Sequence, residues 1–423
     1  MLTFLTLLLG IVWGPREVEL SAPAGTAAVE LFLDGESVAR RTAPPWTLAV
    51  DFGSAPAPHH LDAVARDARG VELGRVRQRV NLPKPEAEAV LALLPGKGGK
   101  GRVAALRWEG AVGKPRAITL NFDGKPLAAL DPEHFDLPAY VPERLHFLQA
   151  VIEFEKGARA EAEITFGGRD RDETSRALTA ISLRVPRGKL PGVEAMSGWL
   201  IADGEPLRVV AAEGGEASIV FVLDADSPPA FRELADWSIL PTRAGMFFSQ
   251  PEVRMLLAYG TEEFGARTAY DAFPRSFPAY LGKGLLHALA EVFPPGGSLT
   301  CPRVADATTA AGLLAASWSH PRAVVVVLTG NLDASVLSAA QARSYLSDLG
   351  VPVVVWTAAS AAPEAAARWG DARPVKTLSD VRAAVKELEG AVREQRIVWV
   401  EGAHLPQAIF VTAAAPAGVV VAR

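Results

Sequence analysis

The periodicity of the sequence changes near residue 195, and this change constrains the fold more than any other feature. Before it, short runs of alternating apolar and polar residues are separated by turn residues, which is typical of antiparallel sheets with one solvated face. After it, apolar runs such as 218–226 and 322–330 alternate with helical patterns such as 303–318 and 378–395. We therefore expect a multi-domain chain in which β-sandwiches precede a doubly wound, Rossmann-like α/β domain.

The antiparallel part contains an internal repeat. Two pairs of segments match: VELFLDGES (29–37) with ITLNFDGKP (118–126), and HLDAVARDARG (60–70) with FLQAVIEFEKG (147–157). Both pairs keep nearly the same offset, so the spacing is preserved together with the pattern, which indicates two copies of one module. Asp34-Gly35 marks a hairpin turn in the first copy. We predict two β-sandwiches of one kind.

These patterns divide the chain into four parts. They are a candidate signal segment (1–15), two sandwiches (16–84 and 85–194) and the α/β domain (195–423). The apolar stretch 1–13 would reach only about 20 Å as a helix, which is too short to span a bilayer. It has the length of a signal-peptide core but lacks a basic flank, and a buried first strand is the alternative. We expect an exported protein (periplasmic, secreted or associated with the cell envelope) with no further transmembrane span.

The composition excludes several functional classes. There are 43 basic and 48 acidic residues, a net charge of -5, and no long Lys/Arg block, so we expect no nucleic-acid binding. Cys301 is the only cysteine, which excludes an internal disulfide and a multi-cysteine zinc site. Neither HExxH nor GxSxG occurs around any histidine or serine, including Ser227. We expect no catalytic residues and no enzymatic activity.

Acidic side chains follow two of the predicted parallel strands. Asp224, Asp226 and Ser227 come directly after one strand, and Asp333 comes shortly after the next. In open α/β sheets, ligands bind at this carboxyl edge. Hard oxygen ligands suit Mg²⁺ or Ca²⁺. This edge is therefore the candidate binding site.

The α/β part resembles a von Willebrand factor A domain, in particular the bacterial secreted VWFA-related proteins. Four segments carry the resemblance: VFVLDADSP, GGSLTCPRVADATTAAG, RAVVVVLTGNLDAS and ARSYLSDLGVPVVVW. The two sandwiches resemble bacterial immunoglobulin-like domains through their (F/L)-x-Asp-Gly layout. The resemblance implies contact with a protein partner at the carboxyl edge of the sheet, where the family's metal ion completes the bond to a carboxylate of the partner.

The family's metal site joins an Asp-x-Ser-x-Ser loop, a Thr from a second loop and an Asp from a third. Asp224 matches the first Asp, Asp226 stands at the first Ser, and Pro228 stands at the second. A proline has no side-chain oxygen to offer a cation. The resemblance therefore implies that the first loop has lost one ligand and changed another.

The other two loops depart from the family pattern as well. Thr300 best matches the family Thr, with Ser298 as the alternative, while Gly330 replaces the last Asp and Asp333 lies just beyond it. We therefore expect a degenerate site with no metal or other cofactor, in which Asp224 accepts hydrogen bonds from nearby backbone N–H groups.

Two functional interpretations are compatible with these patterns. The first is a non-enzymatic exported protein for protein–protein interaction or scaffolding. The rim of its degenerate site consists of Asp224, Asp226, Ser227, Thr300 and Asp333. The alternative is an adhesion or ligand-binding module that depends on weakly bound Ca²⁺ or Mg²⁺, held by Asp224, Asp226 and Asp333. The sequence does not identify the partner.

Overall fold

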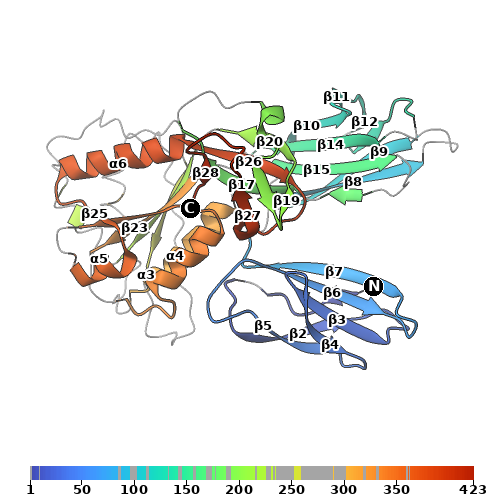
Figure 1. Cartoon of the computed structure of the whole chain (residues 1–423), viewed down its shortest axis with the longest axis horizontal. Helices are drawn as coiled ribbons and strands as arrows, with labels where there is room; N and C mark the ends of the chain where they lie inside the picture. Colours follow the sequence, from blue (N-terminus) through green and yellow to red (C-terminus); the bar gives the residue numbers. More distant parts are fainter. Residues whose placement is uncertain are drawn as a thin grey trace.

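The computed structural model describes three β-sandwiches and one α/β domain (Figure 1). The described residues are 2–8, 10–83, 87–95, 102–110, 114–131, 133–141, 145–155, 159–167, 174–176, 178–186, 192–214, 217–224, 230–231, 234, 252–258, 289, 302–317, 321–329, 333–358, 361 and 363–423. The combination of antiparallel sandwiches with one parallel sheet agrees with the predicted fold class at this level.

The first sandwich packs a sheet of order β1-β2-β5 against a sheet of order β4-β3-β6-β7. Its strands are β1 (Thr3–Phe4), β2 (Pro15–Ser21), β3 (Ala28–Leu33), β4 (Glu36–Arg41), β5 (Thr47–Asp51), β6 (His59–Arg66) and β7 (Glu72–Val80). Val18, Leu31, Val50 and Leu61 are buried in its core. Alternation along each strand places these residues inward, as the sequence pattern predicts.

The apolar N-terminal segment packs against this sandwich. β1 pairs with β2, and Leu2, Phe4 and Val12 are buried in the core. The Asn81 side chain donates to the carbonyl of Val12 (2.6 Å) and accepts from its N–H (2.7 Å). Export stays a prediction. Among the described residues, no helix is both long and apolar enough to cross a membrane.

The second sandwich has sheets of order β11-β10-β14-β15-β16 and β12-β13-β9-β8. Its strands are β8 (Ala87–Pro95), β9 (Arg102–Gly110), β10 (Pro115–Phe122), β11 (Lys125–Pro126), β12 (Ala129–Asp131), β13 (His134–Asp136), β14 (Leu145–Phe154), β15 (Arg159–Gly167) and β16 (Thr174–Arg176). Leu33 pairs with Leu61 in the first sandwich, and Phe122 pairs with Leu148 in the second. The segments that match in sequence therefore occupy equivalent strands.

A third sandwich, which the sequence patterns did not reveal, is built from two separate parts of the chain. Its strands are β17 (Leu178–Arg184), β18 (Leu200–Ala202), β19 (Glu205–Pro206), β20 (Val209–Glu213), β26 (Gln395–Glu401), β27 (Ile409–Val411) and β28 (Val420–Val421). The sheets have orders β20-β26-β17-β28 and β19-β18-β27. The predicted boundary at 194/195 falls inside this sandwich.

The last long strand of the chain belongs to this sandwich rather than to the parallel sheet. β26 pairs antiparallel with β17 over its whole length, from Leu178↔Glu401 to Arg184↔Gln395. The pairing buries Ile181, Leu183 and Val398 in one core. Because that core needs strands from both ends of the segment 178–421, the sandwich closes only after the α/β domain has been traversed.

The α/β domain is thus an insertion in a hairpin of the third sandwich. In the second sandwich β12 begins six residues after Asp123, and in the third β20 begins six residues after Asp203. β12 continues through a short link into its neighbour β13, whereas β20 reaches its neighbour β26 only through the inserted domain. The Gln395 side chain fixes this joint, because it accepts from the N–H of Arg322 (2.8 Å) and from the hydroxyl of Ser182 (3.1 Å).

The inserted domain contains a parallel sheet of order β22-β21-β23-β24-β25. Its strands are β21 (Ser218–Leu223), β22 (Glu252–Leu257), β23 (Arg322–Leu328), β24 (Val353–Thr357) and β25 (Ala372–Pro374), and its helices include α3 (Val304–Ala316), α4 (Ala339–Asp348), α5 (Pro363–Trp369) and α6 (Leu378–Arg393). All residues of β21 and β23 are buried, as continuous apolar strands predict.

Helices cover both faces of this sheet (Figure 1). On one face Phe221 packs in a cluster with residues of α6. On the other face Val222 packs in a cluster with residues of α3 and α4. The two helices on that face approach closely at Gly312, where an added Cβ would lie 2.4 Å from Cγ of Leu346. Successive side chains of β21 thus point to opposite faces of the sheet. Both faces are apolar for this reason, and helices cover each of them.

Candidate functional site

Asp224 ends the buried run of β21 at the carboxyl edge of the sheet and is only 4% exposed. Its carboxylate accepts a hydrogen bond from the N–H of Thr329 (2.7 Å) and a second from the Thr329 hydroxyl. Thr329 directly follows β23, the neighbour of β21, and is also buried. The carboxylate therefore ties the ends of two adjacent strands.

Asp333 caps helix α3. It accepts hydrogen bonds from the N–H groups of Val304 (3.0 Å) and Ala305 (3.2 Å), and from the N–H (3.0 Å) and hydroxyl (2.5 Å) of Ser335. The residue at the N-cap position, Arg303, makes no side-chain cap bond. A carboxylate at a helix N-terminus is stabilised by the free N–H groups and the helix dipole. Asp333 thus supplies the cap from a distant loop.

Asp306 is a third acidic side chain at this edge, and the sequence patterns did not reveal it. It is 2% exposed, pairs with Arg303 (2.6 Å) and accepts from the N–H groups of Val336 (3.1 Å) and Leu337 (3.0 Å). Together with Asp333 it fastens the loop before α4 onto α3. The only sequence signal was an Arg and an Asp three residues apart in the first turn of a helix.

Asp224 and Asp333 border a cleft of about 470 Å³. The residues that line it are Asp224, Val304, Leu328, Asp333, Ser335, Val336, Leu337, Ser338, Ala339, Ala340, Ala365, Arg368 and Trp369. The lining is mainly apolar. Arg368 is exposed, and no ion pair of its side chain is found in the part of the chain that the structure describes. The cleft joins Asp224 and Asp333, two of the predicted site residues, on one surface.

The other predicted site residues lie outside the described residues. They are Asp226, Ser227 and Thr300. Ser298, the alternative to Thr300, and Pro228 and Gly330, which stand at positions of family ligands, also lie outside them. Cys301 also lies outside them. Within the described ranges, no group of three or more His, Cys, Asp or Glu side chains is arranged to hold a metal ion. The structure therefore describes two of the five predicted residues.

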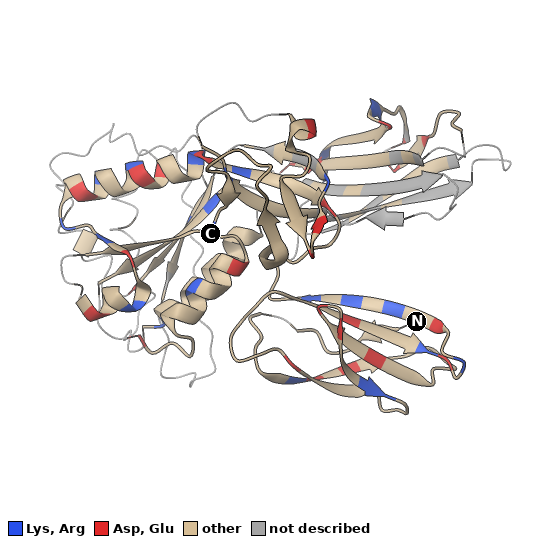
Figure 2. Ribbon diagram, viewed as in Figure 1, with Lys and Arg blue, Asp and Glu red and all other residues tan. Residues whose placement is uncertain are grey.

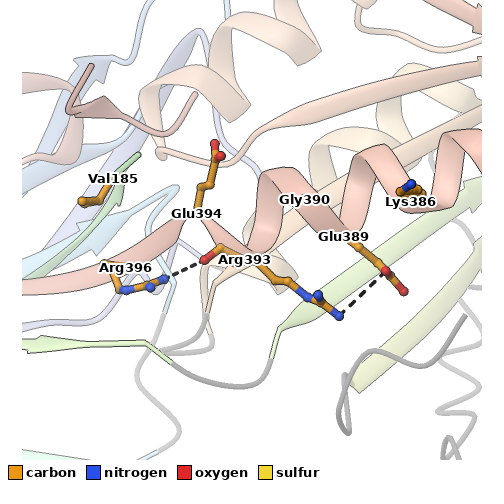
Figure 3. Close-up of a pocket in the computed structure, with 7 residues that line it drawn as sticks. All are labelled: Val185, Lys386, Glu389, Gly390, Arg393, Glu394 and Arg396. Atoms are coloured by element: carbon orange, nitrogen blue, oxygen red, sulfur yellow. Dashed lines mark hydrogen bonds and ion pairs between the residues drawn. The ribbon is translucent and has the colours of Figure 1, made fainter. Parts of the chain in front are cut away.

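A second cleft, of about 550 Å³, lies where α6 returns to the third sandwich (Figure 3). Its lining residues are Val185, Lys386, Glu389, Gly390, Arg393, Glu394 and Arg396. Arg393 lies 3.9 Å from Glu389, and Arg396 donates to the backbone carbonyl of Arg393 (2.7 Å). The charged groups in this cleft are of both signs, and none of the predicted site residues lies there.

Basic residues recur along β7 of the first sandwich (Figure 2). Arg75, Arg77 and Arg79 alternate there on one face of the strand. Arg75 pairs with Glu72 (3.0 Å), and Arg77 makes a bidentate pair with Asp62 (2.8 and 2.9 Å). Charged side chains on a strand at the end of a sheet also oppose pairing with another chain.

Comparison with known proteins gives no family. No family model matches the chain, and no curated protein matches it. Fibronectin III-like modules of CbhA from Clostridium thermocellum share 16% identity over 40% of this chain and 94% of theirs, with a TM-score of 0.16. Proximal thread matrix protein 1 from the mussel byssus shares 12% identity over 44% of this chain and 49% of its own, with a TM-score of 0.31. Similarities this low assign neither family nor activity.

Proposed function

We propose that this chain is a non-enzymatic, exported protein that binds or scaffolds other proteins. In this proposal the sandwiches are immunoglobulin-like modules, and the inserted domain is a von Willebrand A-like domain with a degenerate metal site. The observation that supports it best is the state of Asp224, whose two carboxylate oxygens accept hydrogen bonds from Thr329. The partner would then contact the cleft without a bridging cation.

The hydrogen bonds at the cleft argue against a tightly bound cation. Mg²⁺ requires near-octahedral oxygen ligands at short distances, and Ca²⁺ requires six to eight oxygens. At Asp224 and Asp333 the positive ends of N–H and O–H dipoles already face the oxygens that such a cation would need. A cation would have to displace these donors, and buried donors left without an acceptor are costly.

The lining of the cleft also supports a non-enzymatic role. Of its two serines, Ser335 donates to Asp333 and Ser338 donates to Gln341 (3.0 Å). No histidine or cysteine occurs among the described lining residues. An activated nucleophile normally needs an adjacent general base that is available to take its proton. The carboxylate next to Ser335 is that of Asp333, which is already engaged by the N–H groups at the start of α3.

The alternative function is a cation-dependent adhesion or ligand-binding module. One observation favours it: Asp224 and Asp333 line the same cleft although they follow different strands, β21 and β23. Isothermal titration calorimetry of the full chain with Ca²⁺ and with Mg²⁺ separates the two proposals. We expect no saturable heat, and Asp224→Asn is the matched variant because it keeps the size of the side chain. Saturable binding that this variant abolishes would establish the alternative.

Partner binding at the cleft can be tested with two matched surface variants. Val336 is 61% exposed at the cleft, whereas Val38 is 43% exposed on β4 of the first sandwich. We expect Val336→Asp to weaken capture of envelope proteins by about tenfold, since a charge placed in an apolar interface is strongly disfavoured. Val38→Asp should leave capture unchanged. Equal behaviour of the two variants would argue against binding at the cleft.

A further inference from the structure

The first sandwich is attached to the rest of the chain through helix α4 and the third sandwich (Figure 1). The Tyr345 hydroxyl donates to the carbonyl of Asn81 (2.8 Å), and the Gln341 side-chain amide donates to the carbonyl of Ser54 (3.2 Å). From the third sandwich, the Gln407 side-chain amide donates to a carbonyl of the loop before β6, that of Pro58 (2.8 Å). We call these three hydrogen bonds the docking contacts.

The docking contact at Tyr345 joins two well-fixed groups. Tyr345 is completely buried, so its hydroxyl needs a partner to avoid a large desolvation cost. The acceptor is equally fixed, because the Asn81 side chain also donates to the carbonyls of Val12 (2.6 Å) and Ala57 (2.8 Å). Leu82, the next residue, packs in the same apolar cluster as Tyr345. The first sandwich therefore rests on α4 through a rigid, dry contact.

The same helix forms one wall of the cleft. Its N-cap residue, Ser338, and its first two residues are part of the lining. Gln341 has two roles in this first turn. Its Oε1 accepts from the N–H of Ser338 (2.9 Å), which completes a capping box, while its Nε2 is the docking contact to Ser54. One side chain thus holds both the start of α4 and the first sandwich.

The loop that precedes α4 is held by side-chain acceptors on both sides. The N–H groups of Val336 and Leu337 donate to Asp306 of α3, and that of Ser338 donates to Gln341 of α4. These three amides form what we call the cleft rim. A displacement of α4 relative to α3 would stretch the hydrogen bonds on one side or the other. The rim therefore reports on the position of α4.

We propose that docking of the first sandwich on α4 sets the conformation of the cleft rim. A ligand in the cleft and the docked sandwich then favour the same position of the helix, and by linkage each stabilises the other. The coupling to a ligand rests on the proposed function. The coupling between docking and the rim does not, and it is tested without any ligand or cation.

The test is hydrogen exchange of the full-length chain, read at the rim amides. The double variant Tyr345→Phe, Gln407→Ala removes two docking contacts and changes no residue of the cleft lining. We expect the rim amides to exchange about tenfold faster, since loss of the buried bond of Tyr345 shifts an opening equilibrium by about fivefold and loss of the part-buried bond of Gln407 by about twofold. Gln341→Glu should act in the same direction, because Glu preserves the capping box but cannot donate to Ser54.

Ser344→Gly provides the control. Ser344 is exposed on α4 and takes part in none of the docking contacts, and glycine weakens the helix itself. We expect this variant to leave rim exchange within about twofold of wild type. Unchanged rim exchange in the double variant would overturn the proposal. So would an equal acceleration in Ser344→Gly, because the rim would then respond to helix stability rather than to docking.

Discussion

The second and third sandwiches share a turn but differ in the connection that comes after it. Asp123-Gly124 and Asp203-Gly204 both have positive φ at each residue (48° and 77°, 52° and 82°), as a two-residue hairpin turn requires. The second sandwich closes its next hairpin at once, whereas the third accommodates the α/β domain there. Because β20 and β26 are antiparallel neighbours, the two ends of the insertion lie side by side. This hairpin is therefore a point where the module tolerates a folded insertion.

Removal of the inserted domain tests this comparison most severely. We expect a chain in which 214–394 is replaced by the link of the second sandwich, 132–133, to keep three folded sandwiches. Its far-ultraviolet circular dichroism should lose nearly all helical signal, since the described long helices lie in the insertion. Thermal unfolding should remain cooperative. A control that deletes only 218–328 removes β22, β21 and β23, three adjacent strands of the described parallel sheet, and should aggregate. An unfolded third sandwich in the first variant would show that the insertion is part of its core.

The sequence revealed two copies of the module and concealed the third for a physical reason. Strand β18 supplies only three residues, and its partner β27 is more than two hundred positions away. Periodicity within a window cannot detect such a pairing. The signal that was available is the similarity of DGKPL at 123–127 to DGEPL at 203–207. Because an apolar run comes soon after DGEPL, its local pattern favours a strand that leads into the α/β domain instead.

The site was predictable only in part, for a related reason. The positions of Asp224 and Asp333 after apolar strands placed both at the carboxyl edge of the sheet, and both line the cleft there. The role of Asp333 as the cap of α3 could not be predicted, because Asp333 is distant from the start of α3 in the sequence and meets it only in the folded structure. The same holds for Asn81 and Tyr345, which meet across two domains.

A second test concerns one position that differs among the three sandwiches. In each sandwich the last residue of the strand before the Asp-Gly turn pairs with a residue of a neighbouring strand: Leu61, Leu148 and Ile409 are these partners. The residues directly before the partners, His60, Phe147 and Ala408, are therefore equivalent. Burial, with Arg77 and Arg79 nearby, lowers the pKa of His60 from 6.5 to about 4. The folded first sandwich therefore binds this proton less readily than the unfolded chain does.

The sign of the pH dependence follows from that shift. Above pH 6.5 His60 is neutral in both states, and as the pH falls toward 4 the unfolded chain takes up the proton first. We expect the first sandwich to lose about 2–3 kcal/mol between neutral pH and pH 4.5. Hydrogen exchange of β6 amides measures this loss. His60→Phe, which copies the second sandwich, should abolish it, and an undiminished pH dependence in that variant would contradict the assignment.

The smallest expected effect comes from the aspartates of the three Asp-Gly turns. Asp34 accepts hydrogen bonds from the ring of His59 (2.7 Å) and from the N–H of His60 (2.8 Å), and Asp123 accepts one from His146 (2.8 Å). At the equivalent position the third sandwich has Gln407, whose amide donates to the first sandwich instead. The carboxylates of Asp34 and Asp123 are therefore bound to a histidine of their own module, whereas Gln407 is used for docking.

Asparagine in place of each aspartate tests this division, because asparagine also tolerates positive φ. We expect Asp34→Asn and Asp123→Asn each to destabilise their own sandwich by about 1 kcal/mol, since the charge-assisted bond to histidine is lost while an acceptor remains. Partial exposure of both carboxylates keeps the effect small. Asp203→Asn should cost less than about 0.3 kcal/mol. Amide exchange in β6, β14 and β27 distinguishes the three, and an equal loss in all of them would mean that the turn contributes through its backbone alone.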